Sequence, residues 1–407
     1  MYKPKRKFTI WLDNRLPIIR FFHKHLFSFK VPKDLNYFYS FGGILIIMLL
    51  SQLLTGLVMA IHYIAYVNEA FASIEIFSRS GSLGWLFHPW HTIGSSFFFI
   101  AVYIHIARSL YYKSYQGGKG LNWGLGVFCY LLMLIIAFLG YTLSWGQMSW
   151  MAVTVVSNFF TAVPIIGENL KVWFLGGYEI SQYSLNRFYT FHYFLTFVLI
   201  LIILLHIIAV HTTGQTGSKD NLSFHKAPPV ELVNFYPYYW IKDLFAICIF
   251  LLFFCWFLFY IPDYMGGGSN FMPVNPLIPP KDIIVEWHIL PFYAMLKAVP
   301  FNIGSIAANK LGVYILVAAL VILFFVPVLD KQQGGATRNI LLSQKIFFWL
   351  FIINFISMGY LGTQKLAFEG ELILKLMTIY YFSYFLIILP LFSYLRKRNL
   401  KNAYKKS

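Results

Sequence analysis

Charged residues are scarce in this chain of 407 residues, at 12% against about 25% in an ordinary soluble domain. Cysteine is scarcer still, and the three cysteines lie scattered inside apolar runs, so neither a disulfide framework nor a zinc site is indicated. Hydrophobic residues make up 59% of the chain, and its mean hydropathy is +0.66. A soluble sphere could not bury so much apolar surface, which excludes a soluble enzyme, a disordered chain and a disulfide-rich scaffold.

Eight apolar stretches are long enough to cross a hydrocarbon core of about 30 Å, which needs roughly 20 residues. Each is predicted to be a helix, because a chain in lipid must satisfy its own backbone hydrogen bonds. The predicted fold class is therefore an all-α integral membrane protein with eight transmembrane helices. These spans are residues 39–62, 87–111, 122–143, 188–210, 241–261, 308–328, 344–362 and 372–395.

The segments between the spans suggest four regions. Residues 1–38 are expected to form an amphipathic surface segment without a cleavable signal, because basic and apolar residues alternate from Ile10 to Phe29. Residues 147–170 are too polar to span and too apolar to leave the membrane, so they predict a pair of surface helices between the third and fourth spans. The regions are 1–38, a four-span bundle at 39–240, four further spans at 241–395, and a basic tail at 396–407.

The basic residues are distributed unequally between the two sides. With eight spans, both termini share one side with three of the loops, and this side holds 24 of the 32 Lys and Arg residues. Such an excess marks the cytoplasmic or matrix side, which we call the inner side. The net charge of +17 thus reflects membrane orientation, and no nucleic-acid partner is indicated.

Histidine recurs at one interval in the second and fourth spans. His91 and His105 are 14 residues apart, and so are His192 and His206. Fourteen helical steps end roughly 40° short of four turns, so the members of a pair share one face, about 21 Å apart along the axis. Because both spans run from the outer to the inner side, His91 lies level with His192, and His105 with His206. Two facing pairs at two depths are what two bis-histidine haems require, whereas zinc or copper would prefer several ligands at one depth.

Glycines and arginines support the same interpretation. Gly42 and Gly56 in the first span, and Gly126 and Gly140 in the third, repeat the 14-residue interval at the levels of the histidines. A flat macrocycle between the second and fourth spans would press on these helices, and glycine permits a close approach. A single glycine is ordinary in a membrane helix, and a lone histidine could simply bond a neighbouring helix. The cations expected to meet haem propionates are Arg108 and Arg187.

Several longer stretches carry a family resemblance. They are 55–63 (TGLVMAIHY), 70–75 (AFASIE), 101–112 (AVYIHIARSLYY), 139–149 (LGYTLSWGQMS), 204–214 (LLHIIAVHTTG) and 237–244 (PYYWIKDL). The chain resembles cytochrome b of the respiratory quinol:cytochrome c oxidoreductase (complex III), of the mitochondrial or alphaproteobacterial type. An unsplit chain of eight spans favours this form over the chloroplast relative, whose equivalent is divided into two polypeptides.

The resemblance implies two quinone sites and two b-type haems in the first four spans. His91 and His192 would hold the outer, low-potential haem, and His105 and His206 the inner, high-potential one. The outer site would oxidise quinol, with Glu286 accepting a proton. The position of this acidic residue inside an apolar run is by itself an indication of a functional role. The inner site would reduce quinone, which we expect to be ubiquinone. The residues carried over are Tyr141, Trp145, Gly146, Glu286 and Tyr293 at the outer site, and His211, Lys242 and Asp243 at the inner site.

The resemblance further implies an enzyme, the redox subunit of a proton-translocating quinol–cytochrome c reductase. The implied partners are a Rieske iron–sulfur subunit, a cytochrome c1-type subunit and a second copy of the complex. The abundance of Phe, Tyr and Lys suggests an AT-rich genome and favours the mitochondrial inner membrane over a bacterial plasma membrane. Two rival classes stay open: a two-haem transmembrane reductase of another family, which would need no Glu286 segment, and a haem-free transporter, which would show broken spans and midplane charges.

The chain departs from the family pattern around the outer site. Val285 and His288 flank Glu286-Trp287 where the pattern has Pro-Glu-Trp-Tyr, and Ser144 replaces a proline. Ala152 stands where the family has a glycine whose replacement by alanine is linked to resistance to strobilurin-type inhibitors. With the bulk of Val153, the extra methyl group is expected to narrow the quinol pocket and weaken strobilurin inhibition.

Overall fold

The computed structural model describes residues 6–79, 83–214, 231–265, 268–277, 285–299, 302, 304, 307–331, 342–365 and 367–406. Within these residues, eight helical segments are long and apolar enough to cross a membrane, which confirms the predicted all-α membrane fold. The fourth is longer than predicted at both ends. The segments are Tyr37–His62, Gly84–Tyr111, Gly120–Thr142, Gln182–Thr213, Phe235–Tyr260, Ala308–Leu329, Leu342–Gly362 and Phe368–Arg398.

The first four spans form two tightly packed helix pairs. Helix α3 (Phe41–His62) packs along α5 (Gly84–Tyr111), and α6 (Gly120–Thr142) packs along α9 (Gln182–Thr213). Buried aromatic and aliphatic side chains of α3, α5 and α6 form one continuous core with those of the later spans. Helix α10 (Trp240–Tyr260) covers the side of this bundle formed by α3 and α5.

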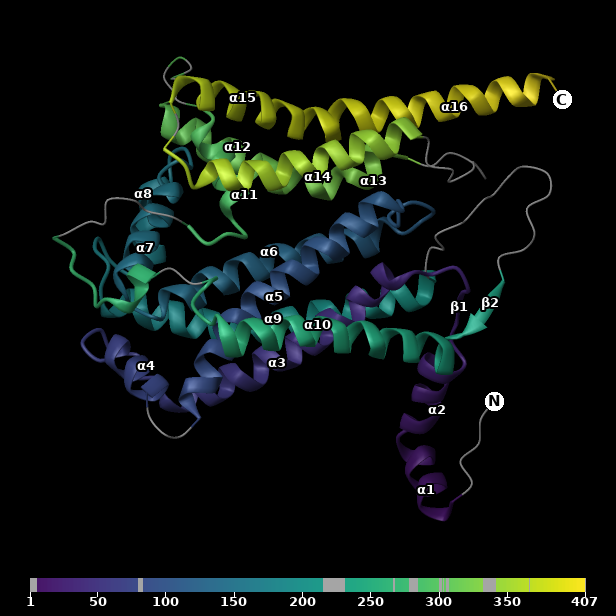
Figure 1. Ribbon diagram of the computed structural model, residues 1–407, viewed down its shortest axis with the longest axis horizontal. Coiled ribbons are helices and arrows are strands. Elements are labelled where there is room, and N and C mark those ends of the chain that lie inside the picture. The colour runs from purple at the N-terminus through teal and green to yellow at the C-terminus, as the bar shows by residue number, and fades with distance from the viewer. Residues whose placement is uncertain are drawn as a thin grey trace.

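The remaining spans form a second layer beside α5 and α6 (Figure 1). The short helix α11 (Leu290–Lys297) packs between α12 (Ala308–Val321) and α14 (Leu342–Gly362), and α14 also contacts α15 (Phe368–Ser383). Helix α15 continues through a π-helical turn into α16 (Leu389–Lys406). Hydrogen bonds tie the two layers together, such as that from Trp123 Nε1 to the carbonyl of Leu323 (2.6 Å).

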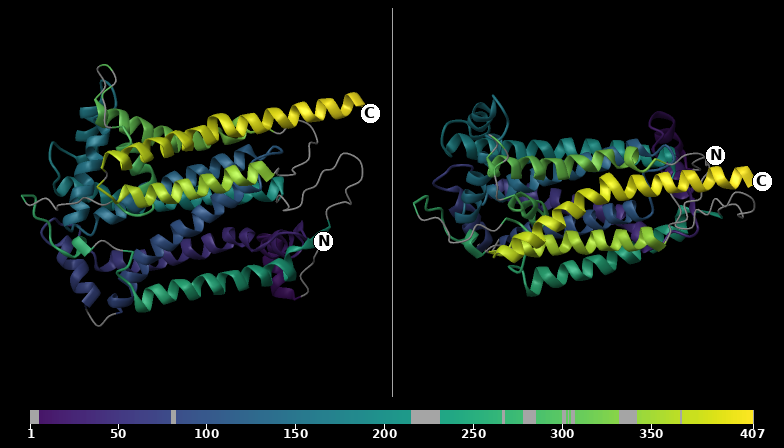
Figure 2. Two further views of the ribbon diagram at one scale, coloured as in Figure 1. Left: turned by 45° about the horizontal axis from the view of Figure 1, so that its top comes forward. Right: turned by 90° about the horizontal axis from the view of Figure 1, so that it is seen from above.

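One end of the molecule carries α1 (Lys7–Arg15), α2 (Ile18–Phe22) and the end of α16 (Figures 1 and 2). Helices α1 and α2 lie crosswise to the spans and expose Phe8, Trp11 and Phe21, while the amphipathic surface segment stays a prediction. A two-stranded antiparallel ribbon, β1 (Lys30–Pro32) with β2 (Leu232–Asn234), joins this segment to the start of α10. We call this the inner end.

Short helices cover the opposite, outer end (Figure 1). The predicted surface helices of residues 147–170 are present as α7 (Gln147–Phe160) and α8 (Gly167–Leu175). A further helix, α4 (Ala70–Arg79), packs against α5 and was not predicted as a separate element.

A buried ion cluster fixes the second layer at the inner end. Asp330, which has no exposed surface, accepts hydrogen bonds from Lys113 (2.9 Å), Tyr115 (2.8 Å) and Arg396 (2.6 Å). Burial lowers the pKa of Lys113 to about 8, although the carboxylate opposes this shift. Because a buried charge without a partner is costly, Asp330 holds the loop after α5 and the helix α16 in place.

Candidate functional site

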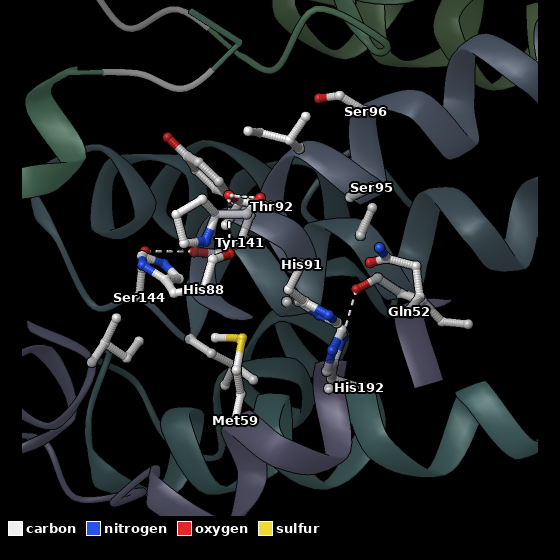
Figure 3. Close-up of a pocket in the computed structure, with 18 of the residues that line it drawn as sticks. Gln52, Met59, His88, His91, Thr92, Ser95, Ser96, Tyr141, Ser144 and His192 are labelled. Carbon is white, nitrogen blue, oxygen red and sulfur yellow. Dashed lines mark hydrogen bonds between the residues drawn. The ribbon is translucent and has the colours of Figure 1, made fainter. Parts of the chain in front are cut away.

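The outer histidine pair faces across the bundle from α5 and α9 (Figure 3). The ring centroids of His91 and His192 are 6.3 Å apart, and the rings stand at 81° to each other. A metal bound between two imidazoles through bonds of about 2.0–2.1 Å separates the ring centres by roughly 6 Å. The observed spacing therefore suits one metal ion held between the two rings.

Hydrogen bonds at the other ring nitrogens fix both imidazoles. Nδ1 of His192 lies 2.8 Å from the carbonyl oxygen of Ile136, which can only accept, so this nitrogen carries the proton. Nδ1 of His91 lies 2.8 Å from the hydroxyl of Thr55, which itself donates to the carbonyl of Ser51 at 2.9 Å. Both rings are thus set in the tautomer that leaves Nε2 free as a ligand, as metal-binding histidines require.

The inner pair lies nearer the inner end. His105 and His206 lie on the same two helices, one 14-residue interval further along each. The His206 side chain interacts with the backbone of Asn122, near the start of α6. Among the described residues, neither pair belongs to a cluster of three or more potential metal ligands.

The four predicted glycines lie beside the four histidines. A Cβ atom built on Gly56 would come within 3.1 Å of the His91 ring, and one on Gly140 within 2.6 Å of the His192 ring. The corresponding distance is 3.3 Å from Gly126 to His206, and 3.9 Å from Gly42 to His105. The close approach predicted for the macrocycle is therefore made by the imidazoles. Glycine at these positions lets each ring lie against the neighbouring helix.

Two arginines and a glutamine present unpartnered polar atoms near the histidines. Arg108, one turn beyond His105, stacks its guanidinium over Tyr39 at 3.7 Å, and its buried Nε has no partner among the described residues. The same holds for Nη1 of Arg187 near the outer end and for Nε2 of Gln52. Free guanidinium donors beside paired imidazoles fit the carboxylates of a haem. The donor set therefore suits two b-type haems.

A cavity of about 1220 Å³ joins the outer histidine pair to the segment after α10. The residues that line it include His91, His192, Tyr141 and Glu286, together with apolar side chains, so it resembles the mostly apolar clefts that bind small ligands. Tyr141 and Ser144 lie on the same wall (Figure 3). The structure thus brings two of the predicted outer-site residues next to the outer pair.

Glu286 has properties that suit a proton acceptor. Its side chain is 32% exposed, and because it lines the cavity, that exposure can face the bound ligand. Burial in the surrounding protein raises the pKa of Glu286 to about 7. A carboxyl group with a pKa near physiological pH is suited to general acid–base chemistry.

Hydrogen bonds join the residues at the junction of α6 and α7 to a segment after α10, residues 268–277, which we call the strapped segment. Gln147 accepts a hydrogen bond from the amide of Asn275 (2.6 Å), and Asn270 donates to the hydroxyl of Ser144 (2.7 Å). A Cβ atom on Gly146 would lie 2.3 Å from the carbonyl oxygen of Asn270, so only glycine fits there. Ser144 therefore supplies a contact between the cavity's two walls.

Other residues predicted for the outer site lie off the cavity wall. Trp145 is buried with Val153 in a separate cluster, and Tyr293 lies on α11 under the ammonium group of Lys297. On α7 the described wall residue is Met148, and neither Ala152 nor Val153 belongs to the lining. The described wall therefore does not include the two side chains expected to narrow the pocket, and weak strobilurin inhibition stays a prediction.

The predicted inner-site residues lie at the inner end in two groups. His211, at the end of α9, contacts the rings of Phe29 (4.4 Å) and His25 (5.3 Å). Lys242 donates to the carbonyl of Leu35 (2.6 Å), and Asp243 accepts from Ser40. The segment before and after β1 therefore contacts both groups, although no described hydrogen bond joins them.

Sequence reasoning missed the residues whose role depends on distant contacts. Thr55 orients His91, and its only sequence signal is its place beside Gly56. Asn270 joins two segments separated by more than a hundred residues. His25 contacts His211 from the surface segment, and no spacing pattern connects them.

These features define a multi-pass membrane protein with paired intramembrane histidines at two depths and a cavity beside the outer pair. Residues 26–214 match the family model described as cytochrome b/b6/petB, and residues 273–382 match cytochrome b(C-terminal)/b6/petD. The chain belongs to the cytochrome b family.

Individual relatives cover almost the whole chain. It is 38% identical to cytochrome b of Rickettsia prowazekii (96% of this chain, 95% of that protein) and 40% identical to that of Yarrowia lipolytica (89% and 91%). A protein named cytochrome b/c1 from Bradyrhizobium diazoefficiens is 40% identical over 96% of this chain and 56% of its own length. A solved hyperthermophilic respiratory complex III contains a chain with a TM-score of 0.85 and 26% identity (95% and 98% covered).

Proposed function

We propose that this chain is the cytochrome b subunit of a quinol:cytochrome c oxidoreductase, oxidising quinol at the outer cavity and reducing quinone at the inner end. The observation that carries the proposal is that Glu286 and the outer histidine pair line the same cavity. A proton acceptor and a redox centre in one apolar space meet the two needs of quinol oxidation, which releases protons and electrons together. Family membership and the similarity to a complex III chain support it.

His91 and His192 would hold one b-type haem, and His105 and His206 the other. When bound, the two haems would supply one-electron carriers at the outer and inner depths. Thr55 and the carbonyl of Ile136 keep the outer ligands in the binding tautomer. Arg108 and Arg187, each with one buried guanidinium nitrogen, would neutralise the haem carboxylates.

At the outer cavity, Glu286 takes the proton that quinol gives up, and Tyr141 forms part of the wall against which the ring packs. Asn270 and Phe271 of the segment bonded to Ser144 form another part of the cavity wall. At the inner end, His211 and Asp243 would bond the quinone carbonyls, with Lys242 beside them. Protons taken up there and released outside would move charge against the membrane potential, at about 2.3 kcal/mol per charge per 100 mV.

The basic inner end is assigned to the matrix or cytoplasmic side, so both termini face that compartment. The proposed location is the mitochondrial inner membrane, or the plasma membrane in a bacterial host. The proposed partners are a Rieske iron–sulfur subunit and a cytochrome c1-type subunit in a homodimeric complex, and the b/c1 name of one relative supports the second. The proposed substrate is ubiquinol.

The proposal is tested by measuring quinol-dependent cytochrome c reduction in membranes that contain the assembled complex. The wild-type complex should be active and should be inhibited at the inner site by antimycin. A complex that contains haem but neither oxidises quinol nor responds to antimycin would contradict the proposed function.

A further inference from the structure

His288 is a buried imidazole that the proposed function does not use. Only 2% of its side chain is exposed, and its ring stacks on Phe99 with 3.8 Å between centroids and 8° between planes. Its backbone carbonyl accepts a hydrogen bond from the hydroxyl of Tyr103, which also lies 3.1 Å from the hydroxyl of Tyr130. The ring is therefore held in one place by the face of α5.

One nitrogen of this ring points at the outer-site carboxyl. Nε2 of His288 lies 3.4 Å from Oε2 of Glu286 and has no hydrogen-bond partner among the described residues. A buried polar atom without a partner costs free energy, and the carboxyl group is the polar group that the structure places within reach. A small rotation of the Glu286 side chain closes the gap to hydrogen-bond distance.

We propose that His288 is a positioning residue that donates a hydrogen bond from Nε2 to the Glu286 carboxylate and holds it against the cavity. The inference rests on the proposed function, in which Glu286 accepts a proton from quinol. For a neutral His288 ring to donate from Nε2 to the carboxylate, its proton must lie on Nε2. Burial lowers the pKa of His288 to about 3, so the ring stays neutral at physiological pH.

The strength of this hydrogen bond would depend on the charge of Glu286. A bond to a carboxylate is roughly twice as strong as one to a neutral group. When the quinol O–H proton moves to Glu286, the bond weakens, and the protonated side chain is free to turn away from the cavity and release its proton. The carboxylate is then held again by His288. The proton is the only species transferred, and it passes from the quinol oxygen to a carboxyl oxygen.

Other titratable groups face the pair from the elements around it. Tyr103 of α5 and Tyr130 of α6 lie beside His288. The groups that line the cavity with Glu286 include Glu75 of α4, His88 and His91 of α5, Tyr141 of α6, His192 of α9, and Asp263 after α10. Substitutions at His288 leave all of these groups in place, so the comparison with the wild type isolates the effect of His288.

The test compares pH profiles of quinol oxidation in the assembled complex. His288→Phe keeps the stack on Phe99 but removes the donor, so the acid limb should move upward by about one pH unit, because a lost hydrogen bond disfavours the carboxylate. His288→Gln keeps an N–H donor near the place of Nε2 and should restore the wild-type profile. If H288F has the wild-type profile, or H288Q shifts as far as H288F, the proposal is wrong.

Two further variants separate this proposal from the proposed function. In a Glu286→Gln background, H288F should change the pH profile no further, because the group that it acts on is gone. If Glu286→Gln alone leaves the acid limb in place, the role of Glu286 itself fails. If the complex with H288F does not assemble, His288→Leu, which also lacks a donor, makes the same test. Unchanged haem spectra show that each complex has folded.

Discussion

The hydroxyl of Thr55 lies 2.8 Å from Nδ1 of His91, one helix away, while the His91 ring faces His192 across the bundle. This contact links the packing of α3 against α5 to the tautomer of a histidine that we propose as a metal ligand. A ligand histidine depends on such an outer partner, which fixes its orientation and raises its basicity.

Thr55→Val should therefore weaken binding of the outer haem by about 10- to 100-fold, the usual cost of losing such a partner. The measurement is haem retained by the purified complex during dilution in detergent, followed by its absorbance. Thr190→Val is the matched control, because the hydrogen bond that the Thr190 hydroxyl makes within the described residues is to its own helix backbone, on an exposed face. Equal haem retention in the two variants would show that Thr55 has no part in ligation.

Gly140→Ala should abolish binding of the outer haem, because the added methyl group would lie 2.6 Å from the His192 ring. The ring would have to move, and ligation tolerates little displacement. Reduced-minus-oxidised spectra count the haems. Gly124→Ala on the same helix meets nothing within 4 Å and should keep both haems. Two haems in Gly140→Ala would argue against this contact.

Quinol oxidation should lose rate as the pH falls through about 7. The pKa of Glu286 is raised by burial to about 7, so the carboxylate that accepts a proton predominates above this pH and disappears below it. Glu286→Gln should remove this acid limb and slow the reaction by about 10²- to 10⁴-fold. The measurement is the rate of cytochrome c reduction between pH 5.5 and 8.5, a range that extends about 1.5 units to either side of the pKa of Glu286. A rate that stays constant across this range in the wild type would contradict the assignment.

Gly146→Ala should block quinol oxidation and leave both haems in place. Its Cβ atom would clash with the carbonyl of Asn270 at 2.3 Å and push the strapped segment away from the cavity. Gly177→Ala at the same end meets nothing within 4 Å and serves as the control. Loss of haem in Gly146→Ala, or full activity, would show that the strap does not define the quinol cavity.

The spans and the histidine pairs could be predicted from sequence because their signals are local and periodic. An apolar run of about 20 residues indicates a membrane span without information from the rest of the chain. Two residues 14 apart in a helix share a face regardless of the neighbouring elements. His91 and His192 could be matched in depth because an even number of membrane crossings fixes their direction.

The rest of the site could not be predicted, because it depends on contacts between distant segments. Asn270 bonds Ser144 across 126 residues, and Lys30 pairs with Asn234 in a ribbon with no hairpin signal. Tyr293 was carried over from the resemblance, but it lies under Lys297 and off the described cavity wall, since the rotation of α11 depends on its neighbours.

The most direct test of the central claim is a haem count in four single variants of the assembled complex. His91→Ala and His192→Ala should each lose the outer, low-potential haem, and His105→Ala and His206→Ala the inner, high-potential one, as resolved by redox titration of the difference spectrum. His23→Ala, in the surface segment, should keep both. If all four variants retain two fully reducible haems, the histidine pairs are not the ligands and the proposed function has no basis.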